Sequence, residues 1–408
     1  MKIKISTIKE YLAIILVWLV ILSSVISIMK DKGWGVSLPI PLYIFEIIVV
    51  GVLFFMQNGK LCIKKSKWII LFSLYIMICT FLNLLGNSMF NWYMRRTIEI
   101  ALAPLIGYYL AQNIDISARK IFYSGLYIAS IGAIIYGFIN YFADLPLQDR
   151  ADSIFGHAIP YSTIIAIFLF MTNFLITKSS VKIILYVFFT LGIISTFSRS
   201  SWIAIIIVAL LLLFSKKKKN KIAKKSIIKG IVLSFIIIIG IILYRNQLQI
   251  ALRYINGLIS NRISGTMGSV SALQRLGTIG YMIEHIGLVG FLVGHGNGQG
   301  GEFLKQTTIV LNNFATTDNQ YISILYDFGL FGIVLVGTLF VKILKTIWER
   351  KMGEESVMLA SVILVSYISA FFYELLGWIN VAELLLILVG IYYNLEVNYS
   401  SNKKRRIK

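Results

Sequence analysis

Stretches of apolar residues long enough to cross a lipid bilayer recur along the whole chain. A membrane-spanning helix needs about 20 mostly apolar residues to cross the hydrocarbon layer. Twelve stretches meet or approach this length: residues 11–29, 37–56, 68–86, 97–113, 121–142, 159–177, 183–197, 202–214, 228–244, 321–341, 357–377 and 379–395. We therefore predict an all-α polytopic membrane protein with about 12 transmembrane helices. The seventh and eighth stretches are short, and we expect them to form a tight hairpin.

Composition agrees with this interpretation and excludes several other classes. The chain has 408 residues, of which 58% are hydrophobic, and its mean hydropathy is +0.81. Soluble globular chains are about 45–50% apolar. The two cysteines, Cys62 and Cys79, have no metal-ligand spacing and indicate no disulfide framework. The net charge of +21 is dispersed between the spans, so we expect no nucleic-acid partner.

Basic residues orient the predicted helices. With both termini in the cytoplasm, 28 of the 39 Lys and Arg residues fall in cytoplasmic segments. Cytoplasmic loops of membrane proteins carry such an excess. Twelve spans also return the C-terminus to the side of the N-terminus. We therefore predict that both termini are cytoplasmic.

Arginine is distributed against this trend. The inner basic residues are almost all lysine, whereas most of the outer ones are arginine. Arginine holds phosphate through two parallel hydrogen bonds, so its outer placement indicates an anionic ligand there. The alternative is that these side chains reach lipid headgroups or pair with carboxylates. The outer arginines are Arg95, Arg96, Arg150, Arg199, Arg245, Arg253, Arg262 and Arg275.

The connection between the ninth and tenth spans is far longer than the others. We predict transmembrane helices 1–9 over residues 1–244, a large extracytoplasmic loop over 245–320, and helices 10–12 with a basic cytoplasmic tail over 321–408. We expect Leu248, Leu252, Ile255 and Ile259 to share one face of an amphipathic helix that lies flat on the outer leaflet. A second helix is predicted over residues 273–286. Loops of this length are usually functional.

The end of this loop holds the strongest candidate for catalysis. Asp318, Asn319 and Tyr321 lead directly into the tenth span. A carboxylate there can deprotonate a sugar hydroxyl as it attacks. Asp and Asn are also favoured helix caps, and the local sequence supports both roles equally.

Two histidines and a glycine cluster are weaker candidates. His295 lies among Gly294, Gly296 and Gly298, where the backbone can approach a ligand or simply turn. His157 opens the sixth span, where a histidine more often serves as a structural donor than as a catalyst.

Common catalytic motifs are absent from the sequence. No Walker loop, no Gly-x-Ser-x-Gly elbow, no His-Glu-x-x-His helix and no Asp-x-Asp pair occurs. We therefore expect no metal and no cofactor. Ionisable residues inside the predicted spans keep a transporter interpretation open, since they usually face a cavity or a partner. These residues are Glu46, Glu99, Asp327, Glu374 and Glu383.

Three segments resemble the O-antigen ligase/polymerase superfamily, over about residues 120–345. Residues 196–202 contain a Ser-Arg-Ser element before a span. Arg275, followed by Gly290 and by the cluster from Gly294, resembles the Arg…Gly-x-Gly stretch of that family's outer loop. Residues 317–332 are similar to its loop-to-span segment. Members are polytopic proteins that join undecaprenyl-diphosphate-linked glycans outside the cytoplasmic membrane.

The resemblance implies a bacterial cytoplasmic-membrane glycosyltransferase whose active site is on the outer face. The ligase branch has a catalytic histidine where this chain has Asp318, and polymerases of the group often carry Asp there. This favours a polymerase of lipid-linked repeat units for a capsule or O-antigen-like polysaccharide.

The resemblance also suggests roles for the candidate residues. Arg199 and Arg275 would bind the leaving diphosphate, Asp318 would act as base, and Asn319 and Tyr321 would position sugar or base. The further candidates for substrate binding are Arg150, His157 and His295. The implied partners are membrane lipid, a chain-length regulator and a flippase. The alternatives are a ligase, which uses another acceptor, and a transporter or flippase of the lipid-linked oligosaccharide.

Overall fold

A computed structural model describes residues 5–31, 40–57, 63–143, 150–215, 270–306 and 315–407. Within these ranges the chain forms helices and contains no β-strand. The first half supplies α1 (Ile5–Asp31), α2 (Leu42–Met56), α3 (Ile63–Leu84), α4 (Phe90–Asn113), α5 (Ile116–Ala143), η1 (Ser153–Phe155), α6 (Ala158–Leu175), α7 (Ser179–Ser195) and α8 (Arg199–Phe214). The second half supplies α11 (Val270–His285), α12 (Leu288–Val293), α13 (Gln299–Lys305), α14 (Gln320–Glu349), α15 (Glu354–Ser369), η3 (Leu375–Gly377) and α16 (Ile379–Ile407).

The apolar stretches of the sequence coincide with the long helices. Six helices are long and apolar enough to cross a membrane, and α2, α7 and α8 are shorter apolar helices. The predicted span 228–244 and the amphipathic helix around Leu248–Ile259 lie outside the described residues. The predicted helix over 273–286 is present as α11. The multi-pass helical architecture is thus confirmed, whereas the number of twelve crossings stays a prediction.

Large apolar side chains face outward as well as inward. Phe55, Leu82, Ile128 and Phe214 are between 68% and 74% exposed although each lies on an apolar helix. Exposed apolar surface on this scale is unusual for a soluble protein and is expected where helices face lipid. Burial inside the bundle therefore explains only part of the hydrophobicity.

The centre of the bundle is the crossing of α4 and α16, where small residues let the backbones touch. A Cβ added to Gly107 would collide with the carbonyl oxygen of Ile387, and one on Gly390 would collide with that of Pro104. Small residues at helix crossings permit such close approach in membranes. Any larger side chain at Gly107 or Gly390 would separate these two helices.

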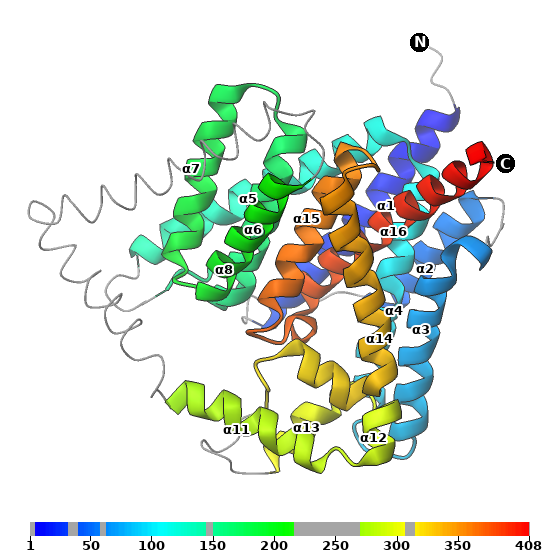
Figure 1. Ribbon diagram of the computed structural model, residues 1–408, viewed down its shortest axis with the longest axis vertical. Coiled ribbons are helices and arrows are strands. Elements are labelled where there is room, and N and C mark those ends of the chain that lie inside the picture. Colours follow the sequence, from blue (N-terminus) through cyan, green and yellow to red (C-terminus); the bar gives the residue numbers. More distant parts are fainter. Residues whose placement is uncertain are drawn as a thin grey trace, which may run out of the picture.

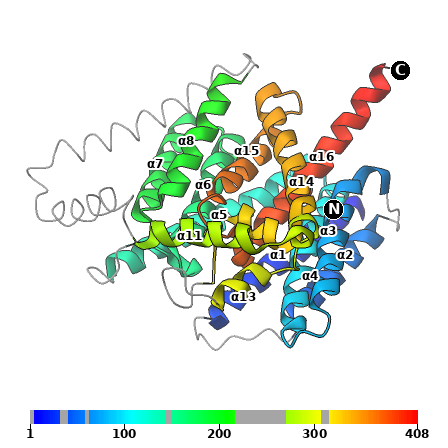
Figure 2. The same ribbon diagram turned by 60° about the horizontal axis from the view of Figure 1, so that its bottom comes forward.

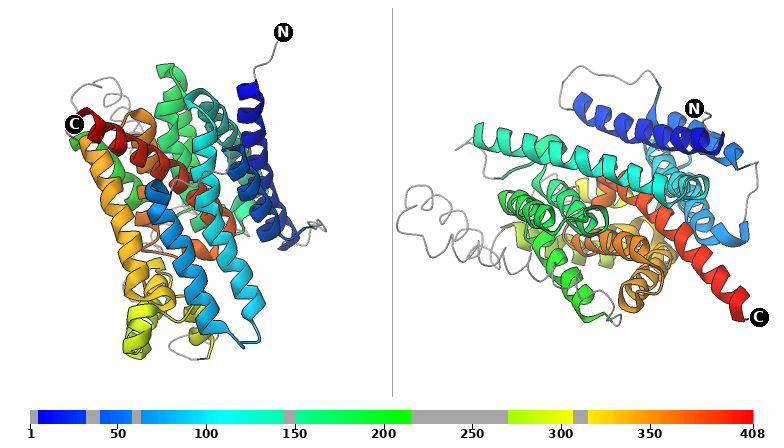
Figure 3. Two further views of the ribbon diagram at one scale, coloured as in Figure 1. Left: turned by 90° about the vertical axis from the view of Figure 1, so that its right-hand side faces the viewer. Right: turned by 90° about the horizontal axis from the view of Figure 1, so that it is seen from above.

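The helices stand side by side, and their ends define two faces (Figures 1 and 3). The beginning of α1 and the end of α16 lie at one face. The short helices α12 and α13, together with α11, lie across the opposite face (Figures 1 and 2). This arrangement is the one required of a bundle whose two ends share one side of a membrane.

The structure corrects one predicted helix. The stretch 357–377 was expected to be a single span, but α15 ends at Ser369 and residues 370–378 form a loop that contains only the short η3. Phe371, Phe372 and Tyr373 make this segment apolar without making it helical. Glu374 therefore lies in a connection between helices and not within a span.

Candidate functional site

The sequence left open whether the residues immediately before α14 cap the helix or act as a base, and the structure divides these roles between Asn319 and Asp318. The side chain of Asn319 caps the helix, because its Oδ1 accepts hydrogen bonds from the backbone N–H groups of Tyr321 (3.0 Å) and Ile322 (3.3 Å). Asp318 does not share this task. Its backbone adopts a left-handed conformation (φ 50°), and its N–H donates to Thr316 Oγ1 at 3.1 Å. The Asp318 carboxylate is thus available for another contact.

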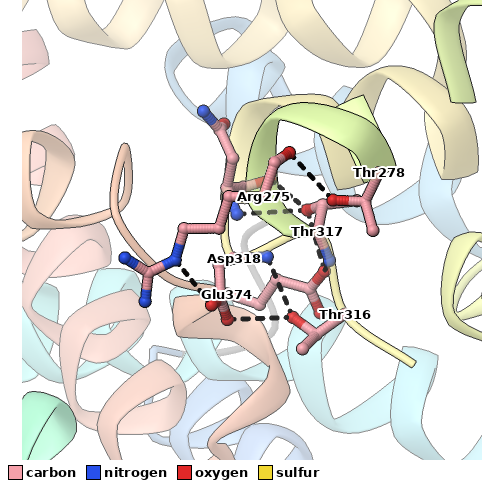
Figure 4. Close-up of polar contacts among 7 residues, drawn as sticks. Arg275, Thr278, Thr316, Thr317, Asp318 and Glu374 are labelled. Carbon is pink, nitrogen blue, oxygen red and sulfur yellow. Dashed lines mark hydrogen bonds and ion pairs between the residues drawn. The ribbon is translucent and has the colours of Figure 1, made fainter. Parts of the chain in front are cut away.

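That contact is an ion pair with Arg275. The Arg275 Nε donates to Asp318 Oδ2 at 2.8 Å, although the two residues are 43 positions apart (Figure 4). Both side chains are partly exposed, at 38% for Arg275 and 23% for Asp318. The terminal nitrogens of Arg275 point away from Asp318 in Figure 4. The pair can therefore meet a ligand while its carboxylate stays oriented.

Arg275 is positioned by the way α11 packs. Gln274, Thr278 and Met282 are at most 1% exposed and form the buried face of the helix. The hydroxyl of Thr278 donates to the Arg275 carbonyl at 2.9 Å. Arg275 lies next to this buried face and so reaches the segment that precedes α14.

Glu374 fixes that segment from the opposite side. Its Oε1 accepts three hydrogen bonds: from the Thr317 N–H (2.7 Å), the Thr317 hydroxyl (2.9 Å) and the Ser323 hydroxyl (2.6 Å). Thr317 is 1% exposed. A half-buried carboxylate with several donors is a stable anchor, because each hydrogen bond to a charged group is worth more than a neutral one. The sequence did not identify Glu374 as a site residue.

The loop that carries Glu374 is itself tied to the bundle. Arg96 on α4 donates to the carbonyls of Leu376 (2.8 Å) and Gly377 (3.1 Å). The side chain of Gln320 accepts from the Leu376 N–H at 2.6 Å, and the Gln320 N–H donates to the Ala370 carbonyl at 2.9 Å. Residues 370–378 therefore hold the start of α14 in one register.

His157 lies beside the same loop. Its ring packs on Trp378 with the ring centroids 5.5 Å apart, and its Nδ1 accepts from the Ile159 N–H (3.3 Å), which caps α6. Burial lowers the pKa of His157, the charges of Arg150 and Arg275 lower it further, and Asp318 and Asp152 oppose them. His157 is therefore neutral at neutral pH, with its proton on Nε2.

Arg150 and Arg199 belong to one corner of the bundle. Arg150 Nε donates to the Thr196 carbonyl at 2.8 Å, and the N–H of Ala151 donates to the Ser195 carbonyl at 3.0 Å. These hydrogen bonds connect the residues just before η1 with the turn between α7 and α8. Arg199 is the first residue of α8 and is exposed. Since the charges of Arg150 and Arg275 both act on His157, this corner adjoins the Arg275–Asp318 pair.

The structure places three of the predicted site residues in packing or capping contacts. The hydroxyl of Tyr321 donates to the Tyr367 carbonyl at 2.7 Å inside the bundle. Asn319 is used as the cap. His295 stacks on Tyr326 with centroids 4.4 Å apart, and its Nδ1 lies 3.1 Å from the Tyr326 carbonyl oxygen. The geometry gives these three residues packing and capping roles, and a substrate role for them stays a prediction.

The glycine cluster packs against protein rather than opening a ligand site. A Cβ on Gly294 would collide with the backbone of Asp327, and one on Gly298 would collide with the ring of Tyr93. The Asp327 carboxylate accepts from the N–H groups of Gly298 (2.7 Å) and Gly300 (2.8 Å). The cluster therefore joins α12 and α13 to α14.

Two other outer arginines have carboxylate partners. Arg95 Nε lies 3.2 Å from Glu99, and Arg96 lies 3.6 Å from the same carboxylate. Arg245, Arg253 and Arg262 lie outside the described residues. Of the eight arginines predicted to lie outside, Arg150 and Arg275 are the ones whose charges act on His157, and Arg275 also pairs with Asp318.

An apolar cavity lies inside the bundle. Gln320 and Tyr321 line it, and it encloses about 800 Å³ of empty space when its open mouth is counted. Its other walls come mainly from α3, α14, α15 and α16, and they include Trp68, Phe72, Leu335, Tyr367, Leu376 and Leu385. The cavity thus reaches the first residues of α14, two positions after Asp318.

Within the ranges that the structure describes, no three His, Cys, Asp or Glu side chains gather as a metal site. The expectation that the protein needs no metal stays a prediction.

Comparison with known proteins gives one family. Residues 184–337 match the family described as O-antigen ligase. The matched segment contains Arg199, Arg275 and Asp318, whereas Arg150, His157 and Glu374 lie outside it. No curated protein matches the chain.

Proposed function

Residues 184–337 form a domain of the O-antigen ligase/polymerase superfamily, and from this premise we propose that the protein polymerises undecaprenyl-diphosphate-linked oligosaccharide repeat units. The product is a surface polysaccharide of the capsule or O-antigen type. The reaction takes place at the outer face of the cytoplasmic membrane.

The observation that carries this proposal is the Arg275–Asp318 ion pair just before α14, a helix whose first residues line an apolar cavity. A lipid-linked donor has a diphosphate, a sugar and a long apolar tail. The diphosphate needs cationic hydrogen-bond donors, which Arg275, Arg150 and Arg199 offer. The sugar needs a nearby base, and the tail needs apolar surface. The corner around Asp318 offers all three.

The reaction follows from this arrangement. A hydroxyl of the incoming repeat unit attacks the anomeric carbon of the growing chain. The new glycosidic C–O bond forms, the bond from the anomeric carbon to the diphosphate breaks, and undecaprenyl diphosphate leaves. The hydroxyl proton passes to the Asp318 carboxylate. Arg275 and Arg199 stabilise the charge that develops on the diphosphate, as fixed cationic donors do in other group transfers.

Arg275 has two tasks in this scheme. Its Nε holds Asp318 Oδ2 in place, and its terminal nitrogens are directed away from Asp318 (Figure 4), where we place the diphosphate. Neutral His157 supplies an Nε2–H donor beside them. Arg150 completes the donor site.

The same proposal covers topology and partners. Both termini lie in the cytoplasm, and residues 245–320 form the extracytoplasmic loop between helices 9 and 10. A flippase delivers the repeat units to the outer face, and a chain-length regulator limits the product.

A glycan ladder tests the proposal. Cells that lack the gene are complemented with the wild-type protein, Asp318→Asn or Glu302→Gln at matched membrane levels. Glu302 is a matched control, because it is an outer carboxylate on α13 that pairs with Lys305 at 2.6 Å. We expect long chains with the wild type and with Glu302→Gln. With Asp318→Asn we expect single lipid-linked repeats outside the membrane.

Two outcomes would favour the other functions. Long chains that form with Asp318→Asn but remain on the lipid carrier would indicate a ligase. Repeats trapped on the cytoplasmic side would indicate a flippase.

A further inference from the structure

Three carboxylates are buried together inside the bundle, apart from the Arg275–Asp318 pair. Glu46 comes from α2, Glu99 from α4 and Glu383 from α16, and they are 0%, 5% and 2% exposed. The carboxyl groups of Glu46 and Glu383 are close enough to interact directly, and Glu99 lies beside both. Buried carboxylates are costly unless they are paired, so each of these charges requires a partner.

Among these three carboxylates of the described chain, only Glu99 forms ion pairs, although the charge of Arg96 also acts on Glu46 and Glu383. Glu99 lies 3.2 Å from Arg95 and 3.6 Å from Arg96. None of the four carboxyl oxygens of Glu46 and Glu383 has a hydrogen-bond partner within the described part of the chain. The neighbour from α1 is Ser24, which carries no charge.

The charges of the cluster do not balance if every carboxyl group is ionised. Three carboxylates would then face two arginines, and Arg95 is 48% exposed. Two like charges that share a buried site cannot both ionise, and one group then keeps its proton. A single proton on either Glu46 or Glu383 would make the cluster neutral. It would also supply a hydrogen bond to oxygens that otherwise have none.

We propose that Glu46 and Glu383 together bind one proton, as a hydrogen-bonded pair of one carboxylic acid and one carboxylate that joins α2 to α16. The titratable and charged groups that face it are Glu99, Arg95 and Arg96 on α4. The pair is a proton-binding site inside the bundle, at a place distinct from the Arg275–Asp318 pair.

The position of the pair links it to the loop of residues 370–378. Arg96 contacts Glu99 with one nitrogen and donates to the carbonyls of Leu376 and Gly377 with another. Loss of the shared proton would add a negative charge next to this guanidinium. That charge would draw Arg96 toward the cluster and away from the loop that carries Glu374.

Infrared spectroscopy of the whole protein in lipid nanodiscs tests the proposal. The C=O stretch of a protonated carboxyl group is distinct from that of an ionised carboxylate, and isotope-labelled glutamate assigns it to Glu side chains. We expect such a signal in the wild type at neutral pH. We expect it to vanish in Glu46→Gln and in Glu383→Gln, because the remaining carboxylate then balances the cluster and the amide donates to it.

Glu355→Gln is the matched control. Glu355 is a buried glutamate, 6% exposed, but it pairs with Arg119 at 2.6 Å. The signal should therefore survive its replacement. A wild-type protein with no protonated glutamate at neutral pH would overturn the proposal, and this result does not depend on how well the variants fold. A signal that persists in both Glu46→Gln and Glu383→Gln would overturn it equally.

Discussion

Asp318 is held by two parts of the chain that lie far from each other in sequence. Its left-handed backbone (φ 50°) is stabilised locally by Thr316, and its carboxylate is oriented by Arg275 on α11. A left-handed conformation is uncommon for residues other than glycine, and Asp is among those that adopt it most readily. Non-glycine residues held in such conformations cluster at functional sites. The residue type and the backbone geometry therefore point to the same position.

The sequence predicted this site in part. Arg275 and Asp318 were both candidates because of their residue type and position, but no local pattern reveals an ion pair across 43 residues. Glu374 was missed because it seemed to lie inside an apolar span. The family resemblance implied that Tyr321 and Asn319 position sugar or base. Helical geometry instead directs Tyr321 into the bundle and uses Asn319 as a cap.

His157 gives a pH dependence with a definite sign. Its pKa lies below the ordinary value near 6.5, chiefly because of burial. Protonation puts a hydrogen on Nδ1, which then cannot accept the capping bond from Ile159. We therefore expect polymerisation to decline as the pH falls below about 6.5. Stability should decline in the same range, because the unfolded chain binds this proton more readily.

The variant His157→Asn tests this expectation. Asn is also a good helix cap, but it does not titrate. Activity and thermal unfolding of the wild type and the variant are measured between about pH 5 and 8. The wild type should lose activity at the acidic end, and the variant should lose less. Identical pH profiles of the wild type and the variant would show that His157 does not control the loss of activity at acidic pH.

At the scale of elements, apolarity identified the helices better than it identified their ends. Stretches such as 121–142 and 159–177 correspond to α5 and α6. The stretch 357–377 failed because its last third is an apolar loop. Leu375 and Leu376 line the cavity in that loop. Hydropathy therefore marks a segment as buried or lipid-facing without deciding whether it is helical.

The bend in α14 is a second feature that hydropathy does not reveal. Gly329 has φ 63° and ψ −169°, a conformation that is essentially restricted to glycine. A Cβ there would lie 2.5 Å from the carbonyl carbon of Leu292. The bend lets α12 pack against α14 and so helps to place the outer helices.

Gly329→Ala should therefore destabilise the protein by at least about 2 kcal/mol, from backbone strain together with overpacking. Gly337→Ala is the matched control. Gly337 lies on the same helix, and a Cβ there meets nothing within 4 Å. The substitution Gly337→Ala should leave the free energy of unfolding unchanged or raise it slightly, because Ala is the better helix former. Thermal unfolding in detergent compares the two, and an equal melting temperature would refute this role of Gly329.

At the scale of the whole molecule, the two faces of the bundle carry different chemistry. The face with α11 to α13 carries Arg275, which pairs with Asp318. The opposite face carries the Arg119–Glu355 ion pair, where the guanidinium donates from Nε (2.6 Å) and from a terminal nitrogen (2.9 Å). This arginine is satisfied by the protein itself. Arg119 thus has a structural role at one face, whereas Arg275 is partly exposed at the other.

The central claim is that this chain lengthens a glycan on its lipid carrier, with Asp318 and Arg275 at the reacting groups. The most direct test is to reconstitute the purified protein in nanodiscs with a lipid-linked single repeat unit and a metal chelator. Chain length and released undecaprenyl diphosphate are then followed together. The account predicts a ladder of lipid-linked chains, one diphosphate carrier released for each new bond, and no growth with Asp318→Asn. Absence of growth with the wild type, or equal growth with Asp318→Asn, would contradict it.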